Sequence, residues 1–345
     1  MLERRTFKEI VEQPEAWAAA IRSFDAAATE VARFFQERSP DEVIFTGCGS
    51  SYYLSMTAAA AFQKVAGLRS RGIPGSEILQ FPESVFIPGS RPLLVASSRS
   101  GTTTETLRAL EIARRRGIAT LSLTCARRSP LARGADLCLI SPKGNEESVV
   151  MTKSFSSLLL LGLLLATNQT GGAALRRDLR RLPALGKRIV KVALNLTGDV
   201  GADAERFVFL GAGPAHGIAW EAMLKMTEMA QRPAVAYHPL EFRHGPMAMV
   251  RPGTLVVFLG VRAGARLEAD LATDIRRHGA TVVSLRDEWP GAEEVDVDVV
   301  LGVRLEDEAR CLLYLPFVQG LAYYRALGAG LDPDRPRHLT SVVRL

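Results

Sequence analysis

The chain has 345 residues, of which 47% are apolar and 23% charged, and its formal net charge is 43 − 37 = +6. This balance is typical of a soluble globular protein. The basic residues stand in short clusters without interleaved aromatic residues, so nucleic-acid binding is not expected, and an anionic substrate suits the charge better.

The sequence gives no sign of a membrane span, a leader or a metal site. Its longest apolar stretch, residues 158–166, falls short of the roughly 20 residues that cross a bilayer, and the N-terminus lacks the apolar core of a signal peptide. The four cysteines have neither CxxC spacing nor a nearby histidine pair, so we expect small buried hydrophobes in a reducing compartment: Cys48, Cys125, Cys138 and Cys311. The chain is predicted to be cytoplasmic.

Strands and helices alternate in two series along the chain. An N-terminal helix is predicted from about residue 7 to 37. The first series has helices near 51–66 and 103–116 and strands at 42–47, 92–97, 119–124 and 136–140. A helical connector covers 173–196. The second series has strands at 206–211, 254–260, 280–285 and 297–303. This alternation predicts parallel sheets with helices on both faces.

The two series resemble each other in sequence. Gly47 aligns with Gly211 at an offset of 164, and Gly117 aligns with Gly279 at an offset of 162. Two matches at nearly one offset predict two related, doubly wound, flavodoxin-like α/β lobes. The predicted organisation is an N-terminal helical segment (1–40), a first lobe (41–172), a helical connector (173–204), a second lobe (205–330) and a C-terminal tail over the site (331–345).

Hydroxyl side chains crowd the junction between the strand at 92–97 and the next helix. One N-cap needs one hydroxyl, but this junction offers Ser97, Ser98, Ser100, Thr102, Thr103 and Thr104. Ligands of such sheets bind at the carboxyl ends of the strands, and helix amides hold phosphate without a lysine. The Gly-x-Gly turns lack the third glycine of a dinucleotide site. A phosphomonoester site is therefore predicted, with a hydroxyl-rich cap that binds no ligand as the alternative.

The second lobe lacks this hydroxyl cluster, since its equivalent junction reads "FLGVRAGARLEAD", and so one phosphate site per chain is expected. It carries Glu221, Lys225 and Glu228 at i, i+4 and i+7, which is one helical face. A solvated salt-bridged stripe would have the same spacing. The apolar residues that cover the rest of this helix indicate burial, and buried charges are costly unless they are used.

Four motifs together resemble the tandem sugar isomerase (SIS) domain family: "GCGSSYY", "SSRSGTTTETL", "EESVVMTKSF" and "EFRHGPMAMV". The chain is similar to the isomerase half of glucosamine-6-phosphate synthase and to stand-alone amino-sugar-phosphate deaminases and isomerases. The synthase has a glutaminase domain whose nucleophile is the cysteine after the initiator methionine. Here that residue is Leu2, so no glutaminase is expected and free ammonia would be released or consumed.

The resemblance assigns roles to individual residues. It places substrate and phosphate binding in the first lobe, on Ser50, Ser51, Ser98, Ser100, Thr103 and Val149. Arg99 stands where the synthase has a glutamine, and it is predicted to contact the phosphate or to point to solvent.

In the second lobe the resemblance makes Glu228 the base that moves a proton between C1 and C2 of the open-chain sugar, with Glu221 and Lys225 beside it. His244 would open the sugar ring and reach the site of a neighbouring subunit, which implies a homodimer. An ordinary loop histidine is the alternative. Glu241 would order this loop or lie near the sugar.

The tail departs from the family pattern. The resemblance places Thr340 and Ser341 at the substrate, where the family has alanine and a lysine that forms an imine with the keto sugar. Synthase-like isomerisation is weakened by this change, whereas deamination, in which the substrate supplies its own nitrogen, is not.

The sequence therefore predicts an isomerase/deaminase that converts glucosamine 6-phosphate to fructose 6-phosphate and ammonia, without a metal or an organic cofactor. One alternative is a deglycase or isomerase for another amine-linked sugar phosphate, such as fructosamine 6-phosphate or galactosamine 6-phosphate. The other is a non-catalytic sugar-phosphate-binding protein.

Overall fold

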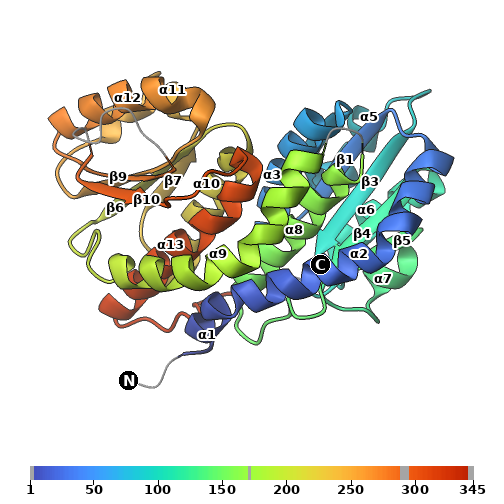
Figure 1. Cartoon of the computed structure of the whole chain (residues 1–345), viewed down its shortest axis with the longest axis horizontal. Coiled ribbons are helices and arrows are strands. Elements are labelled where there is room, and N and C mark those ends of the chain that lie inside the picture. Colours follow the sequence, from blue (N-terminus) through green and yellow to red (C-terminus); the bar gives the residue numbers. More distant parts are fainter. Residues whose placement is uncertain (1–3, 170–171, 288–294, 341–345) are drawn as a thin grey trace. The chain divides into compact units, whose positions relative to one another are not determined.

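Two parallel sheets of five strands each organise the chain in the computed structural model, which describes residues 4–169, 172–287 and 295–340 (Figure 1). Residues Glu12–Ala184 build the first unit. Residues Leu185–Leu339, together with the N-terminal residues up to Val11, build the second. Helices lie on both faces of each sheet, so the predicted doubly wound α/β fold is confirmed.

The first sheet has the order β2-β1-β3-β4-β5. Its strands are all parallel: β1 (Glu42–Gly47), β2 (Arg69–Pro74), β3 (Pro92–Ser98), β4 (Ala119–Thr124) and β5 (Leu137–Ile140). Because β2 lies on one side of β1 and β3 on the other, the order reverses between β1 and β3. In such sheets the crevice at the carboxyl ends of these two strands is the usual ligand site.

Alternate side chains of the central strands face the two helical layers of the first unit. Ile44 and Leu94 pack against the layer formed by α4 (Gly75–Gln80), α5 (Pro82–Val85), α6 (Thr104–Arg115) and α7 (Pro130–Gly134). Phe45 packs on Phe62 in the other layer, which contains α2 (Gln13–Arg38), α3 (Ser50–Ala66) and α8 (Lys153–Thr167). The Trp17 indole donates a hydrogen bond of 2.8 Å to the Ser156 hydroxyl and so joins α2 to α8.

The second sheet repeats this arrangement with the order β10-β9-β8-β6-β7. Its strands are β6 (Arg206–Gly211), β7 (Ala234–Tyr237), β8 (Thr254–Leu259), β9 (Thr281–Arg286) and β10 (Val297–Val300). One layer contains α10 (Pro214–Lys225), a π-helix (Met226–Ala230) and α13 (Asp307–Gly328). The other contains α11 (Pro239–Phe242) and α12 (Ala265–Arg277).

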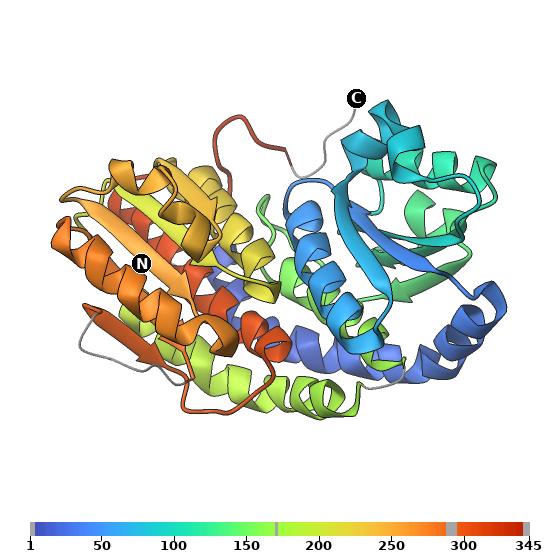
Figure 2. The ribbon, with the colours of Figure 1, turned by 90° about the horizontal axis from the view of Figure 1, so that it is seen from above.

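Further segments lie outside the two sheets and their helical layers. Helix α9 (Ala173–Thr197) links the two units, and α1 (Arg5–Val11) packs on α13. Two 3₁₀ turns cover Pro246–Met249 and Arg262–Gly264. After α13, residues 331–340 run without helix or strand (red in Figure 2).

Three expectations about the elements need correction. The N-terminal helix predicted over 7–37 is two helices, because Pro14 starts a new helix and has no N–H to continue the first. Strands β2 and β7 were missed. Both are short edge strands with partly exposed residues, and β2 reads "RSRGIP", so they lack the apolar run that marks a buried strand.

The cysteines are only partly the buried hydrophobes that the sequence predicts. Cys125 and Cys311 are buried, and burial raises the pKa of both thiols, whereas Cys48 and Cys138 are half-buried. In the described residues no helix is both long and apolar enough to cross a bilayer; the leucine-rich α8 has 15 residues.

The two Gly-x-Gly turns require glycine for the same two physical reasons. A Cβ on Gly47 would lie 2.7 Å from the carbonyl oxygen of Ser51, and one on Gly211 would lie 2.3 Å from that of Ala215. The second glycines have φ/ψ of 53°/−126° (Gly49) and 52°/−125° (Gly213), which side chains strongly disfavour. The first glycine allows the helix backbone to approach the end of the strand, and the second adopts the positive φ with which the chain enters the helix.

Replacing Gly213 by alanine should lower the free energy of unfolding by about 1–3 kcal/mol, because its Cβ meets no atom and the cost is that of the backbone conformation alone. Urea unfolding checks this. The control is Gly328→Ala, at an open position of ordinary φ in α13, which should be neutral or slightly stabilising. Equal losses in both variants would contradict the explanation.

Candidate functional site

The hydroxyl-rich junction of the first unit forms a compact loop at the carboxyl end of β3, residues 98–103, here called the cradle loop. The Ser98 hydroxyl lies 3.0 Å from that of Thr103 and accepts a bond of 3.1 Å from the amide of Gly101. The Ser100 hydroxyl accepts bonds from the amide and the hydroxyl of Thr102, at 3.2 and 2.9 Å. The structure thus brings the predicted hydroxyls Ser98, Ser100 and Thr103 into one loop.

Glycine is required at the centre of the cradle loop. Gly101 has φ of +63°, and a Cβ there would lie 2.1 Å from the Ser129 hydroxyl. Thr103 is the N-cap residue of α6 and Gly49 is that of α3, and neither helix start, both within the described residues 4–169, has a side-chain cap bond. Helix starts without a capping side chain are a common place for a bound phosphate, so these two adjacent helix starts form the candidate anion site.

The other predicted residues of the first lobe lie at the same edge. Ser50 and Ser51 open α3 after β1, the strand paired with β3, and both are at most 6% exposed. Ser51 Oγ lies 4.0 Å from Met151 Sδ. The carbonyl oxygen of Val149 accepts a bond of 3.0 Å from Arg99. In the tail, Thr340 is exposed, and Ser341 lies outside the described residues.

Arg99 does not point to solvent. Its side chain is 8% exposed, and the guanidinium pairs at 3.4 Å with the carboxylate of Glu146, which is fully buried. Sequence reasoning quoted the motif "EESVVMTKSF" but gave Glu146 and Met151 no role. The motif carries three charged residues, Glu146, Glu147 and Lys153, and nothing in the sequence singles out Glu146 among them.

The three charged residues of the second lobe form one ionic cluster. Lys225 Nζ lies 3.4 Å from Glu221 Oε1 and is also paired with Glu228 Oε2. The side chains of Glu221 and Lys225 are 0% exposed, and that of Glu228 is 20% exposed. The cluster is therefore buried rather than a solvated stripe, and Glu228 is the member that solvent or a substrate can reach.

Glu228 lies in a π-helix instead of the continuous α-helix that the i, i+4, i+7 spacing assumes. Helix α10 ends at Lys225, the π-helix covers Met226–Ala230, and Gln231 follows with φ of +51°. Single π turns occur often at functional sites, and a left-handed non-glycine residue is uncommon. The local backbone is thus irregular at the predicted base.

His244 and Glu241 lie on an exposed segment, at helix α11 and the turn after it. Glu241 lies in α11 and His244 in the turn that follows it, and Gly245, at φ of +118°, leads from this turn into the 3₁₀ turn Pro246–Met249. The His244 amide donates to the Glu241 carbonyl at 3.0 Å. Both side chains are exposed in the single chain, so the structure does not bring His244 together with Lys225 and Glu221 in the buried cluster.

A second histidine, His216, was not predicted to matter. Trp220 Nε1 donates to His216 Nε2 at 3.1 Å, which leaves His216 Nδ1–H to donate to the Gly211 carbonyl at 3.1 Å. Burial lowers the pKa of His216, and the His238 ring 6.5 Å away adds to this effect. A neutral imidazole with a fixed tautomer thus lies at the carboxyl end of β6. The first lobe has hydroxyls at the equivalent place, and its Ser51 corresponds to Ala215, the residue before His216, at the offset of 164.

The junction after β8, which corresponds to the cradle loop, is filled by side chains of the protein itself. Arg262 donates to Asp287 Oδ2 at 2.7 and 3.1 Å, and Arg310 pairs with both Asp287 and Asp307. Glu268 is 2% exposed, and neither of its carboxylate oxygens has a hydrogen-bond partner in the described chain. Burial raises the pKa of Glu268 to about 8, to which Asp307 adds and which Arg310 opposes.

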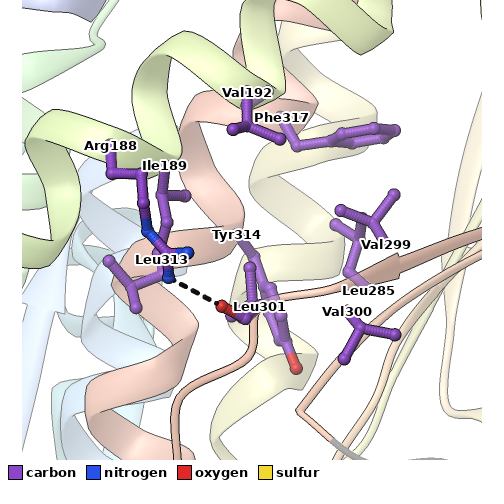
Figure 3. A pocket seen from close by; sticks show the side chains of 11 residues that line it. Arg188, Ile189, Val192, Leu285, Val299, Val300, Leu301, Leu313, Tyr314 and Phe317 are labelled. Atoms are coloured by element: carbon purple, nitrogen blue, oxygen red, sulfur yellow. Dashed lines mark hydrogen bonds between the residues drawn. The ribbon is translucent and has the colours of Figure 1, made fainter.

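A cavity of about 70 Å³ lies elsewhere in the second unit, and Figure 3 shows the side chains that line it. Its walls are apolar side chains of α9, β9, β10 and α13, such as Ile189, Val299 and Phe317, and Arg188 at its rim donates to the Leu301 carbonyl at 3.1 Å. None of the predicted site residues lines this cavity, so it is distinct from the candidate site.

The profile of the SIS domain matches residues 38–168 and 202–322, one stretch in each half of the chain. This chain belongs to the SIS domain family. A solved glucosamine-6-phosphate deaminase from Thermotoga maritima is 32% identical, with a TM-score of 0.81 over 99% of this chain and 100% of its own. A tagatose-6-phosphate ketose/aldose isomerase from Escherichia coli shares the fold, with a TM-score of 0.86 at 24% identity over 96% of this chain and 94% of its own.

Curated relatives of greater length match as well. A glutamine–fructose-6-phosphate aminotransferase (isomerizing) from Pyrobaculum aerophilum is 30% identical over 97% of this chain and 56% of its own length. The chain thus spans a little more than half the length of such relatives.

Glu268→Gln should stabilise the protein at pH 8 and have little effect at pH 5. The pKa of Glu268 is about 8 in the folded protein and about 4.5 in the unfolded chain. Between pH 4.5 and pH 8 the folded protein therefore keeps a proton that the unfolded chain has released, and the free energy of unfolding falls as the pH rises towards 8. Glutamine removes this loss, a gain on the order of 3 kcal/mol at pH 8. Urea unfolding at both pH values measures it.

The control for this experiment is Glu37→Gln, whose side chain is 62% exposed and which should show no such pH-dependent gain. A Glu268→Gln variant that is equally stabilised at pH 5 and pH 8 would show that ionisation of this carboxyl is not the cause.

Proposed function

We propose that this SIS protein is an amino-sugar-phosphate isomerase/deaminase that converts glucosamine 6-phosphate and water to fructose 6-phosphate and ammonia. The buried Glu221–Lys225–Glu228 cluster carries the proposal, because it presents one reachable carboxylate from an otherwise enclosed set of charges. The cradle loop supports a phosphorylated substrate, and the similarity to the Thermotoga maritima deaminase supports an amino sugar.

Binding would begin with the phosphate group. The hydroxyls of Ser98, Ser100 and Thr103 and the first amides of α6 are donors of the kind that hold a phosphomonoester. Fixing the phosphate orients the sugar and lowers the entropic cost of the later steps.

The chemistry consists of proton transfers and one hydrolysis. His244 would move a proton to the ring oxygen and open the sugar. Glu228 would take the proton from C2 and return it to C1, while a proton of the substrate's amino group passes to O1; together these transfers convert the aldehyde at C1 to an alcohol and leave an imine at C2. Water adds to C2 of this imine and ammonia leaves, which gives the ketose. Lys225 would hold Glu228 in place through their ion pair.

Glu228→Gln should abolish ammonia release while substrate binding is retained, because glutamine keeps the shape of the side chain but cannot accept the proton. Ammonia release from purified protein and calorimetric binding of glucosamine 6-phosphate measure the two effects. The matched control is Glu205→Gln, an exposed residue of the same unit, which should retain turnover. Turnover by Glu228→Gln would refute the assignment of the base.

The outcome for the wild type decides between the candidate functions. If ammonia is released only from galactosamine 6-phosphate or fructosamine 6-phosphate, the assignment of Glu228 as the base stands and the proposed substrate is replaced by that sugar phosphate. Binding without turnover of any of these substrates would identify a sugar-phosphate-binding protein.

We further propose a homodimer in which His244 serves the partner subunit's substrate. Mixing the inactive variants Glu228→Gln and His244→Ala should then restore about a quarter of the wild-type activity, because half of the dimers are mixed and each has one intact site of two. Ammonia release after subunit exchange measures this. No recovery, despite exchange verified by mass spectrometry, would contradict a shared site.

A further inference from the structure

Arg99 stands between two cradle hydroxyls, Ser98 and Ser100, yet its side chain turns to another segment. This segment, residues 146–151, precedes α8 and is here called the strap. The guanidinium donates to three successive carbonyl oxygens of the strap, at 3.2 Å to Ser148, 3.0 Å to Val149 and 3.4 Å to Val150. One side chain thus fixes the course of the strap backbone.

Glu146 anchors the beginning of the strap. One of its oxygens accepts 2.6 Å bonds from both the amide and the hydroxyl of Thr152, the N-cap residue of α8. The other accepts from Ser154 and from Arg99. The buried guanidinium is therefore neutralised by a carboxylate that is itself fully buried, and the strap is fixed at both ends.

The strap lies beside the cradle. Met151 Sδ is 4.0 Å from the hydroxyl of Ser51, and the side chains of Val149 and Met151 are both partly exposed. A ligand whose phosphate sits at the first turns of α3 and α6 would therefore have this apolar wall next to it. The backbone of Arg99 remains in the cradle loop, where its carbonyl accepts bonds from Thr124 and Cys125.

We propose that Arg99 is a positioning residue that holds the strap as the wall of the sugar site and does not bind the phosphate. This inference rests on the proposed function. The charge of Arg99 is compensated within the protein and its donors are directed at the strap, so it has little to offer a phosphate. The planar guanidinium suits this role because its several N–H donors have fixed directions and can reach successive carbonyl oxygens, whereas a lysine ammonium is a compact point charge.

The test compares two ligands in Arg99→Gln. Affinity for fructose 6-phosphate, which uses cradle and wall, should fall about tenfold or more, the loss expected when bonds of 1.5–3 kcal/mol to a charged group are removed. Affinity for inorganic phosphate, which uses the cradle alone, should change less than about twofold. The control Arg115→Gln, a 77% exposed arginine on α6, should change neither.

Two outcomes would overturn the proposal. Equal losses for both ligands would make Arg99 a phosphate ligand, and unchanged affinity for both would remove its role altogether. If Arg99→Gln does not fold, Arg99→Lys replaces it in the test, since lysine keeps the positive charge beside Glu146 but lacks the planar set of N–H donors that reaches the strap carbonyls. It should show the same selective loss in smaller measure.

Hydrogen exchange separates this inference from the proposed function. Failure of the wild type to bind any sugar phosphate would refute the proposed function. The amides of residues 148–152 should still exchange at least about tenfold faster in Arg99→Gln, while those of 98–103 keep their rates. Unchanged exchange in the strap would refute the positioning role whatever the substrate.

Discussion

The parallel pairing of β1 with β3, and of β6 with β8, is the constraint on which the candidate site depends. Parallel strands direct all their carboxyl ends to one edge, and β1 pairs in register with β3 so that Thr46 lies opposite Ala96. The loops that follow these strands must then lie side by side. Hydroxyls about 50 residues apart in the sequence thus reach one edge, which they could not do in an antiparallel hairpin.

The two lobes fill the same place in the fold in different ways. Both keep the glycine pair that brings a helix start against the strand end. In the part of the chain that the structure describes, the helix starts at these junctions lack a side-chain cap in both lobes, but only the first lobe surrounds them with hydroxyls, which suits the proposed phosphate. The second lobe closes its junction with arginines and carboxylates of its own, and His216 replaces hydroxyls after β6. The two lobes thus pair one hydroxyl-rich junction, the proposed anion site, with one junction that is neutralised by side chains of the protein itself.

Sequence reasoning gave the fold and the central strands, because buried parallel strands are apolar runs and each lobe repeats the other. It missed β2 and β7, since an edge strand is specified by its neighbour's unpaired backbone groups and needs no apolar pattern. It placed Glu228 on the right helix but assumed an α-helical path through a π turn, which no residue pattern encodes. It found Arg99 as an unusual cation but not its partner, because the pairing with Glu146 spans 47 residues and depends on the tertiary course of the strap.

The tail shows how local anchoring bears on the proposed chemistry. Asp334 accepts hydrogen bonds from the amides of Arg5 and Thr6 and so caps the start of α1, and Asp332 pairs with Arg4 at 2.7 Å. The base of the tail is therefore fixed to the N-terminal helix of its own unit, independently of any lysine further along. This anchoring involves Asp332 and Asp334 and does not depend on the residue at position 341. The resemblance places the imine-forming lysine at position 341, where this chain has serine, and a substrate that carries its own nitrogen does not require that lysine. The departure in the tail is thus compatible with the proposed deamination and unfavourable to an imine-dependent isomerisation of a keto sugar.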